Sequence, residues 1–214
     1  MGEKVTFPSN GHTCGGYLAK PPFGKGPAVV VIQEWWGLVP HIKDICDRFA
    51  KEGFVAVAPD QAGRLLMELD VERANAEIAG AADYVLSRPE CSSKTFGVVG
   101  FCMGGALAQY AATSNPKVGA AVSFYGGFKQ VPLNWENLNA PILLIYGEMD
   151  DGVPASEAAP LEKKLKELGK TVDTEIFRKA PHGFFNDTRP EAYREKCARD
   201  AWKRTVDLFR AHVR

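Results

Sequence analysis

One cysteine of the sequence stands in a setting that suits a nucleophile. Cys102 lies in Gly100-Phe101-Cys102-Met103-Gly104, between an apolar run and a stretch of small residues that favour a helix. A nucleophile on a sharp turn from strand to helix takes strained backbone angles, and glycines two residues to either side let the strand and the helix pass each other. The N-terminus of the following helix favours a thiolate. We therefore expect Cys102 to be a nucleophile rather than one more buried cysteine.

A thiol is weakly ionised at neutral pH, so it needs a base that takes its proton or holds the thiolate. His182 follows the last predicted strand, in the segment APHGFF, and is the expected base. The other histidines fit this role less well. His12 lies in an N-terminal turn, His41 opens a helix, and His212 is two residues from the C-terminus.

An acid that could orient this histidine follows the apolar run PILLIY, in the segment GEMDDGVP. Asp150 would fix the tautomer and the orientation of the His182 ring. The chain order of nucleophile, acid and histidine is that of α/β-hydrolases. As alternatives, Asp150 could be a turn residue or a helix cap, and Asp151 could be the acid instead.

A third strand end carries Gln33-Glu34-Trp35-Trp36-Gly37. In α/β-hydrolases one oxyanion-hole N–H comes from the residue after the nucleophile and the other from a loop at this place. Met103 and Trp35 are therefore the expected backbone donors. Glu34 is a carboxylate after an apolar run, heading towards the site, where it could act as an extra base. It could also point to solvent or cap the following segment.

The elements that must position these residues alternate between short apolar runs and helical patterns. Such alternation predicts an α/β fold, a mostly parallel sheet of about seven to eight strands with helices on both faces, in a single domain spanning residues 1–214. Chemistry then collects at the carboxyl ends of the strands. We expect strands at 4–7, 13–19, 28–33, 54–58, 95–99, 120–124, 141–146 and 171–177, and helices at 41–52, 71–87, 105–112, 157–168 and 189–213.

Composition excludes several classes of protein. The 214 residues carry 26 basic and 26 acidic side chains, which gives no support for nucleic acid or an anionic membrane as a partner. No apolar run is long enough to span a bilayer, and the N-terminus lacks the apolar region of a signal peptide. The five cysteines are far apart and form neither a disulfide framework nor a zinc site. We expect a cytoplasmic protein, and since nothing requires more, a monomer.

The sequence resembles the dienelactone hydrolase (carboxymethylenebutenolidase) family over nearly its whole length. The segments VVVIQEWWG, FVAVAPD, GVVGFCMGG, YGEMDDGVP and APHGFF occur in the family's order and spacing. The resemblance implies Cys102 as nucleophile, His182 as base and Asp150, four residues before Pro154, as its partner. It also implies that Glu34 holds the cysteine in a resting, largely protonated state and helps to deprotonate it once substrate binds.

The resemblance further implies an α/β-hydrolase fold without a cofactor and a substrate that is an unsaturated lactone bearing a carboxylate, opened through an acyl-enzyme. The sequence departs from the family at the substrate. Asn186 stands where an arginine four residues after the histidine binds the carboxylate, and Arg64 is the nearest equivalent of a second arginine. The candidate walls of the substrate pocket are Trp35, Trp36, Phe101, Tyr125 and Phe184, although an aromatic residue at any one of these positions is by itself more typical of the core.

Other functions fit parts of the same pattern. A general carboxylesterase or thioesterase for small activated esters would use the same residues, and the departure at Asn186 favours it. A non-catalytic binding protein of this fold would show gaps in the triad or in the oxyanion loop, and none is visible. A redox role of Cys102 is a further alternative, because thiolates oxidise readily.

Overall fold

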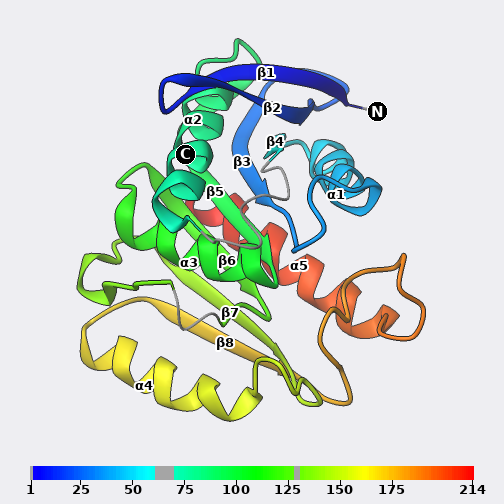
Figure 1. Cartoon of the computed structure of the whole chain (residues 1–214), viewed down its shortest axis with the longest axis vertical. Coiled ribbons are helices and arrows are strands. Elements are labelled where there is room, and N and C mark those ends of the chain that lie inside the picture. Colours follow the sequence, from blue (N-terminus) through cyan, green and yellow to red (C-terminus); the bar gives the residue numbers. More distant parts are fainter. Residues whose placement is uncertain (1, 61–69, 128–130) are drawn as a thin grey trace.

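The computed structural model describes residues 2–60, 70–127 and 131–214, and within them eight strands form one sheet (Figure 1). The order across the sheet is β1-β2-β4-β3-β5-β6-β7-β8. Strands β3 to β8 run parallel, while β1 and β2 form an antiparallel edge. The bounds are β1 (Glu3–Ser9), β2 (His12–Ala19), β3 (Gly26–Ile32), β4 (Val55–Pro59), β5 (Cys91–Phe101), β6 (Val118–Phe124), β7 (Ile142–Gly147) and β8 (Val172–Phe177).

Helices cover both faces of the sheet (Figure 1). On one face α1 packs against β2, β3 and β4, and α5 packs against β6 and β7; α2, α3 and α4 lie on the other face. None of the described helices combines the length and the apolarity that crossing a membrane requires. The bounds are α1 (Pro40–Lys51), α2 (Val71–Leu86), α3 (Met103–Ser114), α4 (Ala158–Glu167) and α5 (Glu195–His212), with short 3-10 helices η2 (Trp135–Asn137) and η3 (Ala155–Glu157).

The central strands are apolar throughout because both of their faces are covered. In β3, Val29 and Val31 face the core under α1 and α5, while Val30 and Ile32 face the core under α2 and α3. This packing confirms the prediction of a mostly parallel sheet between two helical layers. It also fixes the carboxyl ends of β3, β5, β6 and β7 side by side, where the candidate residues lie.

The predicted elements are present, but two helix starts differ. The α3 helix begins at Met103, directly after Cys102, and not at residue 105. The prediction that the last helix begins at residue 189 is wrong, because α5 begins at Glu195. The N–H of Arg194 donates to the carbonyl of Phe184, and Arg194 is extended with φ −130°. This link back to the loop holds residues 189–194 in turns until the helix begins.

Candidate active site

Cys102 lies at the junction of β5 and α3 with a strained backbone. Its φ is 56° and its ψ is −118°, a conformation that an L-residue adopts only under constraint. Two hydrogen bonds supply that constraint. The Cys102 N–H donates to the carbonyl of Phe124 on β6, at 3.0 Å, and the Gly105 N–H donates to the Cys102 carbonyl at 2.9 Å. The two bonds therefore maintain the strained turn and keep the thiol at the N-terminus of α3, as the sequence predicts.

The glycines of the Cys102 segment are required by close backbone contacts. A Cβ on Gly100 would lie 1.8 Å from the carbonyl oxygen of Gly104, and a Cβ on Gly104 would lie 2.4 Å from that of Gln33. Real Cβ atoms do not approach so closely. Strand β5 and helix α3 therefore pass each other only because Gly100 has no side chain, and α3 approaches the end of β3 only because Gly104 has none.

His182 is paired with Asp150. Its Nδ1 lies 2.7 Å from Oδ2 of Asp150, whose side chain is completely buried. The other oxygen, Oδ1, accepts hydrogen bonds of 2.9 Å from the backbone N–H groups of Gly152 and Val153. Asp151, the alternative acid, is exposed, and in the described part of the chain no hydrogen bond joins it to the ring. The two aspartates that the sequence left open are thus distinguished by their position.

The imidazole of His182 favours its protonated form. Burial of the ring lowers the pKa, but hydrogen bonds to Asp150 and Cys102, with the charges of the same two residues, outweigh burial and raise the pKa of His182 from 6.5 to about 10. Since Nδ1 is engaged by Asp150, Nε2 is the nitrogen left for Cys102. A protonated imidazole beside the thiol is an arrangement that suits nucleophilic catalysis.

The two expected oxyanion-hole donors follow the neighbouring strands β5 and β3. Met103 is the first residue of α3, so no carbonyl of its own helix can accept from its N–H. Trp35 follows β3, in a turn in which the Gly37 N–H donates to the Glu34 carbonyl. Gly104 packs directly against the end of β3, which brings the two loops together.

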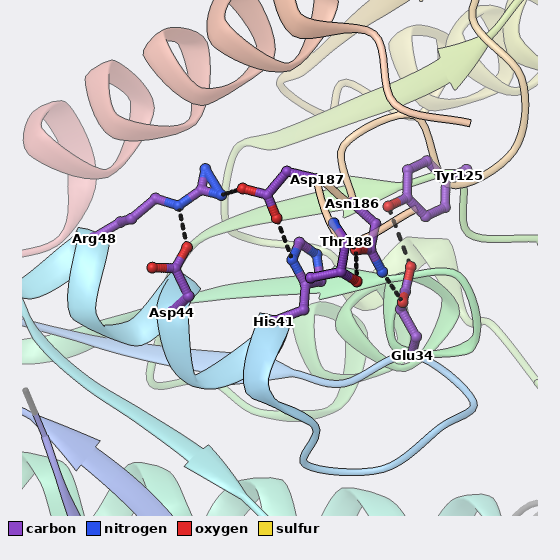
Figure 2. A network of polar contacts seen from close by, with 8 residues as sticks. All are labelled: Glu34, His41, Asp44, Arg48, Tyr125, Asn186, Asp187 and Thr188. Carbon is purple, nitrogen blue, oxygen red and sulfur yellow. Dashed lines mark hydrogen bonds and ion pairs between the residues drawn. The ribbon is translucent and has the colours of Figure 1, made fainter. Parts of the chain in front are cut away.

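Glu34 is almost fully buried, with 3% of its surface exposed, and both carboxylate oxygens have partners (Figure 2). Oε2 accepts a 2.9 Å hydrogen bond from Nδ2 of Asn186, and Oε1 accepts one of 3.5 Å from the hydroxyl of Tyr125. Among the described residues, no hydrogen bond joins Glu34 to Cys102. The carboxylate is therefore buried and does not point to solvent, and its bonds go to an amide and a phenol and not to the thiol.

The segment 186–188 is itself fastened to helix α1 (Figure 2). One carboxylate oxygen of Asp187 lies 3.1 Å from a guanidinium nitrogen of Arg48, and the other lies 3.4 Å from Nδ1 of His41. His41 is buried, and its burial lowers its pKa against the opposing charges of Glu34 and Asp187. Sequence reasoning missed this cluster, because a histidine in a helix and an Asn-Asp-Thr segment after the last strand carry no shared motif.

The residues expected to line the substrate pocket differ in their exposure to solvent. Trp36 is exposed over 67% of its surface, whereas Tyr125 and Phe184 are fully buried and their rings pack 5.7 Å apart. The Tyr125 ring also lies 4.9 Å from the ring of His182. Tyr125 has a positive φ of 39°, a second strained residue at this edge of the sheet. The Arg64 position lies outside the described residues.

A cavity of about 300 Å³ adjoins His182. Arg189 lines it, and the Nε atom of this residue donates to Glu191 at 3.0 Å. Asp151 also lines the cavity, so the positive charge of Arg189 is offset by two carboxylates.

The comparisons with known proteins agree with one another. The model of the dienelactone hydrolase family matches residues 14–213. Protein usf of Aquifex pyrophilus is 37% identical over 231 residues, and a protein provisionally named a carboxymethylenebutenolidase from Aquifex aeolicus is 35% identical over 232 residues; both alignments cover all of each chain. A crystal structure of a provisionally assigned dienelactone hydrolase from Klebsiella pneumoniae has a TM-score of 0.89 at 28% identity, with 98% of each chain covered. These matches confirm the predicted α/β-hydrolase fold.

Proposed function

The chain belongs to the dienelactone hydrolase family, and on that basis we propose that it opens an unsaturated lactone through an acyl-enzyme on Cys102. It is a hydrolase of carboxylic esters or lactones, and the proposal concerns its substrate and its mechanism. Cys102 is the nucleophile, His182 the general base and acid, and Asp150 the residue that orients the imidazole.

Acylation begins with the thiolate of Cys102. Sγ attacks the carbonyl carbon, a carbon–sulfur bond forms, and the carbonyl electron pair moves to the oxygen. The backbone N–H groups of Met103 and Trp35 stabilise the resulting oxyanion. When the oxyanion collapses, the ring carbon–oxygen bond breaks. The leaving enolate takes the proton held on Nε2 of His182, and the enol then tautomerises.

Deacylation uses the same groups, but His182 now acts as a base and not as an acid. Neutral His182 removes a proton from water, the hydroxide oxygen attacks the thioester carbon, and the carbon–sulfur bond breaks. The thiolate is regenerated beside the imidazolium, and the product leaves as a carboxylic acid. Asp150 stays ionised throughout and keeps Nδ1 protonated.

The observation that carries the proposal is the convergence of three separate strand ends on one site. Cys102 is held in a strained turn at the N-terminus of α3, in contact with His182, and His182 is bonded to the buried Asp150. This is the arrangement that nucleophilic catalysis by a thiol requires.

A second candidate, a general esterase for small activated esters without a carboxylate, is favoured by Asn186. The Asn186 side chain is neutral, and its amide nitrogen donates to Glu34. It therefore supplies no cation for a carboxylate of the substrate.

The test is a panel of lactones and p-nitrophenyl esters, each with and without a free carboxylate, hydrolysed by the wild type, Cys102→Ala and Arg64→Ala. Cys91→Ala is the matched control, because Cys91 begins β5 at the opposite end of the strand. We expect no turnover by Cys102→Ala and full turnover by Cys91→Ala. Mass spectrometry of acid-quenched enzyme should find the acyl group on Cys102. Full activity of Cys102→Ala would remove it as the nucleophile, and equal turnover with and without the carboxylate would select the esterase.

A further inference from the structure

Glu34 is bonded to the side-chain amide of Asn186, and the orientation of that amide is fixed. The Oδ1 atom of Asn186 accepts hydrogen bonds from the backbone N–H of Thr188, at 3.0 Å, and from the Thr188 hydroxyl, at 2.6 Å (Figure 2). With both donors on Oδ1, the Nδ2 side of the amide faces Glu34 and can only donate to it. The Asn186 side chain is 3% exposed, so water does not compete for these bonds.

A hydrogen bond and a ring contact connect Glu34 to His182 through Tyr125. The Tyr125 hydroxyl donates to Oε1 of Glu34, and the Tyr125 ring packs on His182 with 4.9 Å between ring centres. Burial, followed by the charges of Glu34 and Cys102, holds the pKa of Tyr125 well above its usual value. The phenol thus remains a donor, and the strained φ of 39° fixes its backbone.

We propose that Asn186 is a positioning residue which, oriented by Thr188, holds the Glu34 carboxylate away from Cys102, so that Glu34 acts on catalysis by fixing Tyr125 against His182. Glu34 then does not exchange a proton with the thiol. The proton partner of Cys102 is His182 in the resting enzyme as well as during turnover. This inference rests on the proposed function for its meaning in catalysis.

The polar and titratable groups around Glu34 come from three parts of the chain. Tyr125 faces it from the end of β6, Asn186 from the loop after His182, and His41 from α1. His41 is in turn countered by Asp187, which also pairs with Arg48. Asp187 thus ties the same loop to α1 without bonding Glu34, which makes it a matched control.

The first test is Glu34→Gln, which keeps the size and shape of the side chain. The amide oxygen still accepts from Asn186, and its nitrogen donates to the phenol oxygen of Tyr125. We expect kcat to fall by less than about tenfold, because loss of a general base costs about 10²- to 10⁴-fold. A loss in that larger range would overturn the positioning role and make Glu34 a base.

The second test is Asn186→Asp, in which two carboxyl groups stand about 2.9 Å apart. Two such groups do not both ionise, and they share one proton until the pH rises. While the proton is shared, Glu34 stays in place, and when it is lost, repulsion displaces Glu34. We expect near wild-type kcat at low pH and an additional loss of about tenfold as the pH rises, with KM little changed. A pH profile of the wild-type shape would contradict the proposal.

Three further variants separate positioning from folding. Tyr125→Phe and Thr188→Val should lower kcat with KM unchanged, while Thr188→Ser, which retains the hydroxyl, should restore it. Asp187→Asn should lower thermal stability but keep the wild-type pH profile. If Tyr125→Phe had the kcat of the wild type, Glu34 would not act on His182 through Tyr125. If Asp187→Asn showed the additional ionisation, the effect of Asn186→Asp would reflect the stability of the loop and not the position of Glu34.

A readout without substrate distinguishes this inference from the proposed function. The rate at which iodoacetamide alkylates Cys102 is measured against pH by mass spectrometry, in the wild type and in Asn186→Asp. We expect the variant to show the additional ionisation in this reaction too. If no lactone or ester is hydrolysed but the alkylation profile shifts, the proposed function fails and the positioning role stands. If hydrolysis occurs and the profile does not shift, the reverse holds.

Discussion

His182 Nδ1 and Asp150 Oδ2 lie 2.7 Å apart, while the other oxygen of Asp150 accepts from the N–H groups of Gly152 and Val153. The two backbone donors decide what an amide would do in place of this carboxylate. In Asp150→Asn the amide oxygen must face Gly152 and Val153, so the NH₂ group faces His182 and donates to Nδ1.

This reversal forces the wrong tautomer on His182, with its proton on Nε2 towards Cys102. We expect Asp150→Asn to lower kcat on the order of 10³- to 10⁴-fold with the fold intact. The control is Asp151→Asn, which removes an exposed carboxylate and should retain activity within about threefold. Steady-state kinetics and circular dichroism of both variants check this. Equal losses in the two variants would show that the loop, and not the tautomer, is responsible.

The raised pKa of His182 makes stability depend on pH. The pKa is about 10 in the folded protein and 6.5 for a free imidazole, so the folded state holds the proton more tightly. The contribution of His182 is therefore fully present below pH 6.5 and is lost as the pH rises towards 10. The difference in unfolding free energy between the wild type and His182→Gln, from urea titrations, should shrink across this range. A difference that grows with pH would refute the assignment.

Gly100 has no room for a side chain, whereas Gly15 has. A Cβ on Gly100 would overlap the Gly104 carbonyl at 1.8 Å, but a Cβ on Gly15 would meet its nearest atom, the Cβ of Asp60, at 3.7 Å. We expect Gly100→Ala to destabilise the protein by about 3 kcal/mol or more and to abolish activity. Gly15→Ala should be neutral or stabilising by up to about 1 kcal/mol. Thermal denaturation and activity of the pair give the comparison.

The cysteines should differ in reactivity. Burial, with the charges of nearby acids, raises the pKa of Cys14 to about 11 and that of Cys46 further still. Cys102 instead lies half-buried beside His182. We expect one equivalent of iodoacetamide at neutral pH to modify Cys102 first and to leave Cys14 and Cys46 unmodified in the folded protein. Peptide mapping measures this. Labelling of Cys14 or Cys46 before Cys102 would contradict the prediction that Cys102 is the most reactive thiol.

The fold and the grouping of Cys102, Asp150 and His182 were predictable because their signals are local. Continuous apolar runs mark the covered strands, and Cys102, Asp150 and His182 each follow such a run, so the rule for parallel sheets brings them together. The residues alone did not distinguish Asp150 from Asp151, and only the family resemblance favoured Asp150, because the distinction depends on which side chain a single turn directs inward.

The role of the 186–188 segment was also beyond the sequence. Asn186 drew notice only as a missing arginine, whereas its partner Glu34 lies 152 residues away along the chain. The start of α5 was predicted wrongly for a similar reason, since the bond from the Arg194 N–H to the Phe184 carbonyl depends on the conformation of the loop. Contacts between side chains of distant segments follow from the packed structure, and no periodicity of the chain encodes them.

The strained backbone of Cys102 places activity and stability in opposition at one residue. A φ of 56° with a ψ of −118° costs a side chain of the L configuration about 1–3 kcal/mol, and glycine adopts such angles freely. Cys102→Gly should therefore be inactive and yet melt at a higher temperature than the wild type. Under the proposed function, Cys102 is maintained against the conformational preference of the fold, so relaxed selection for catalysis would favour its loss.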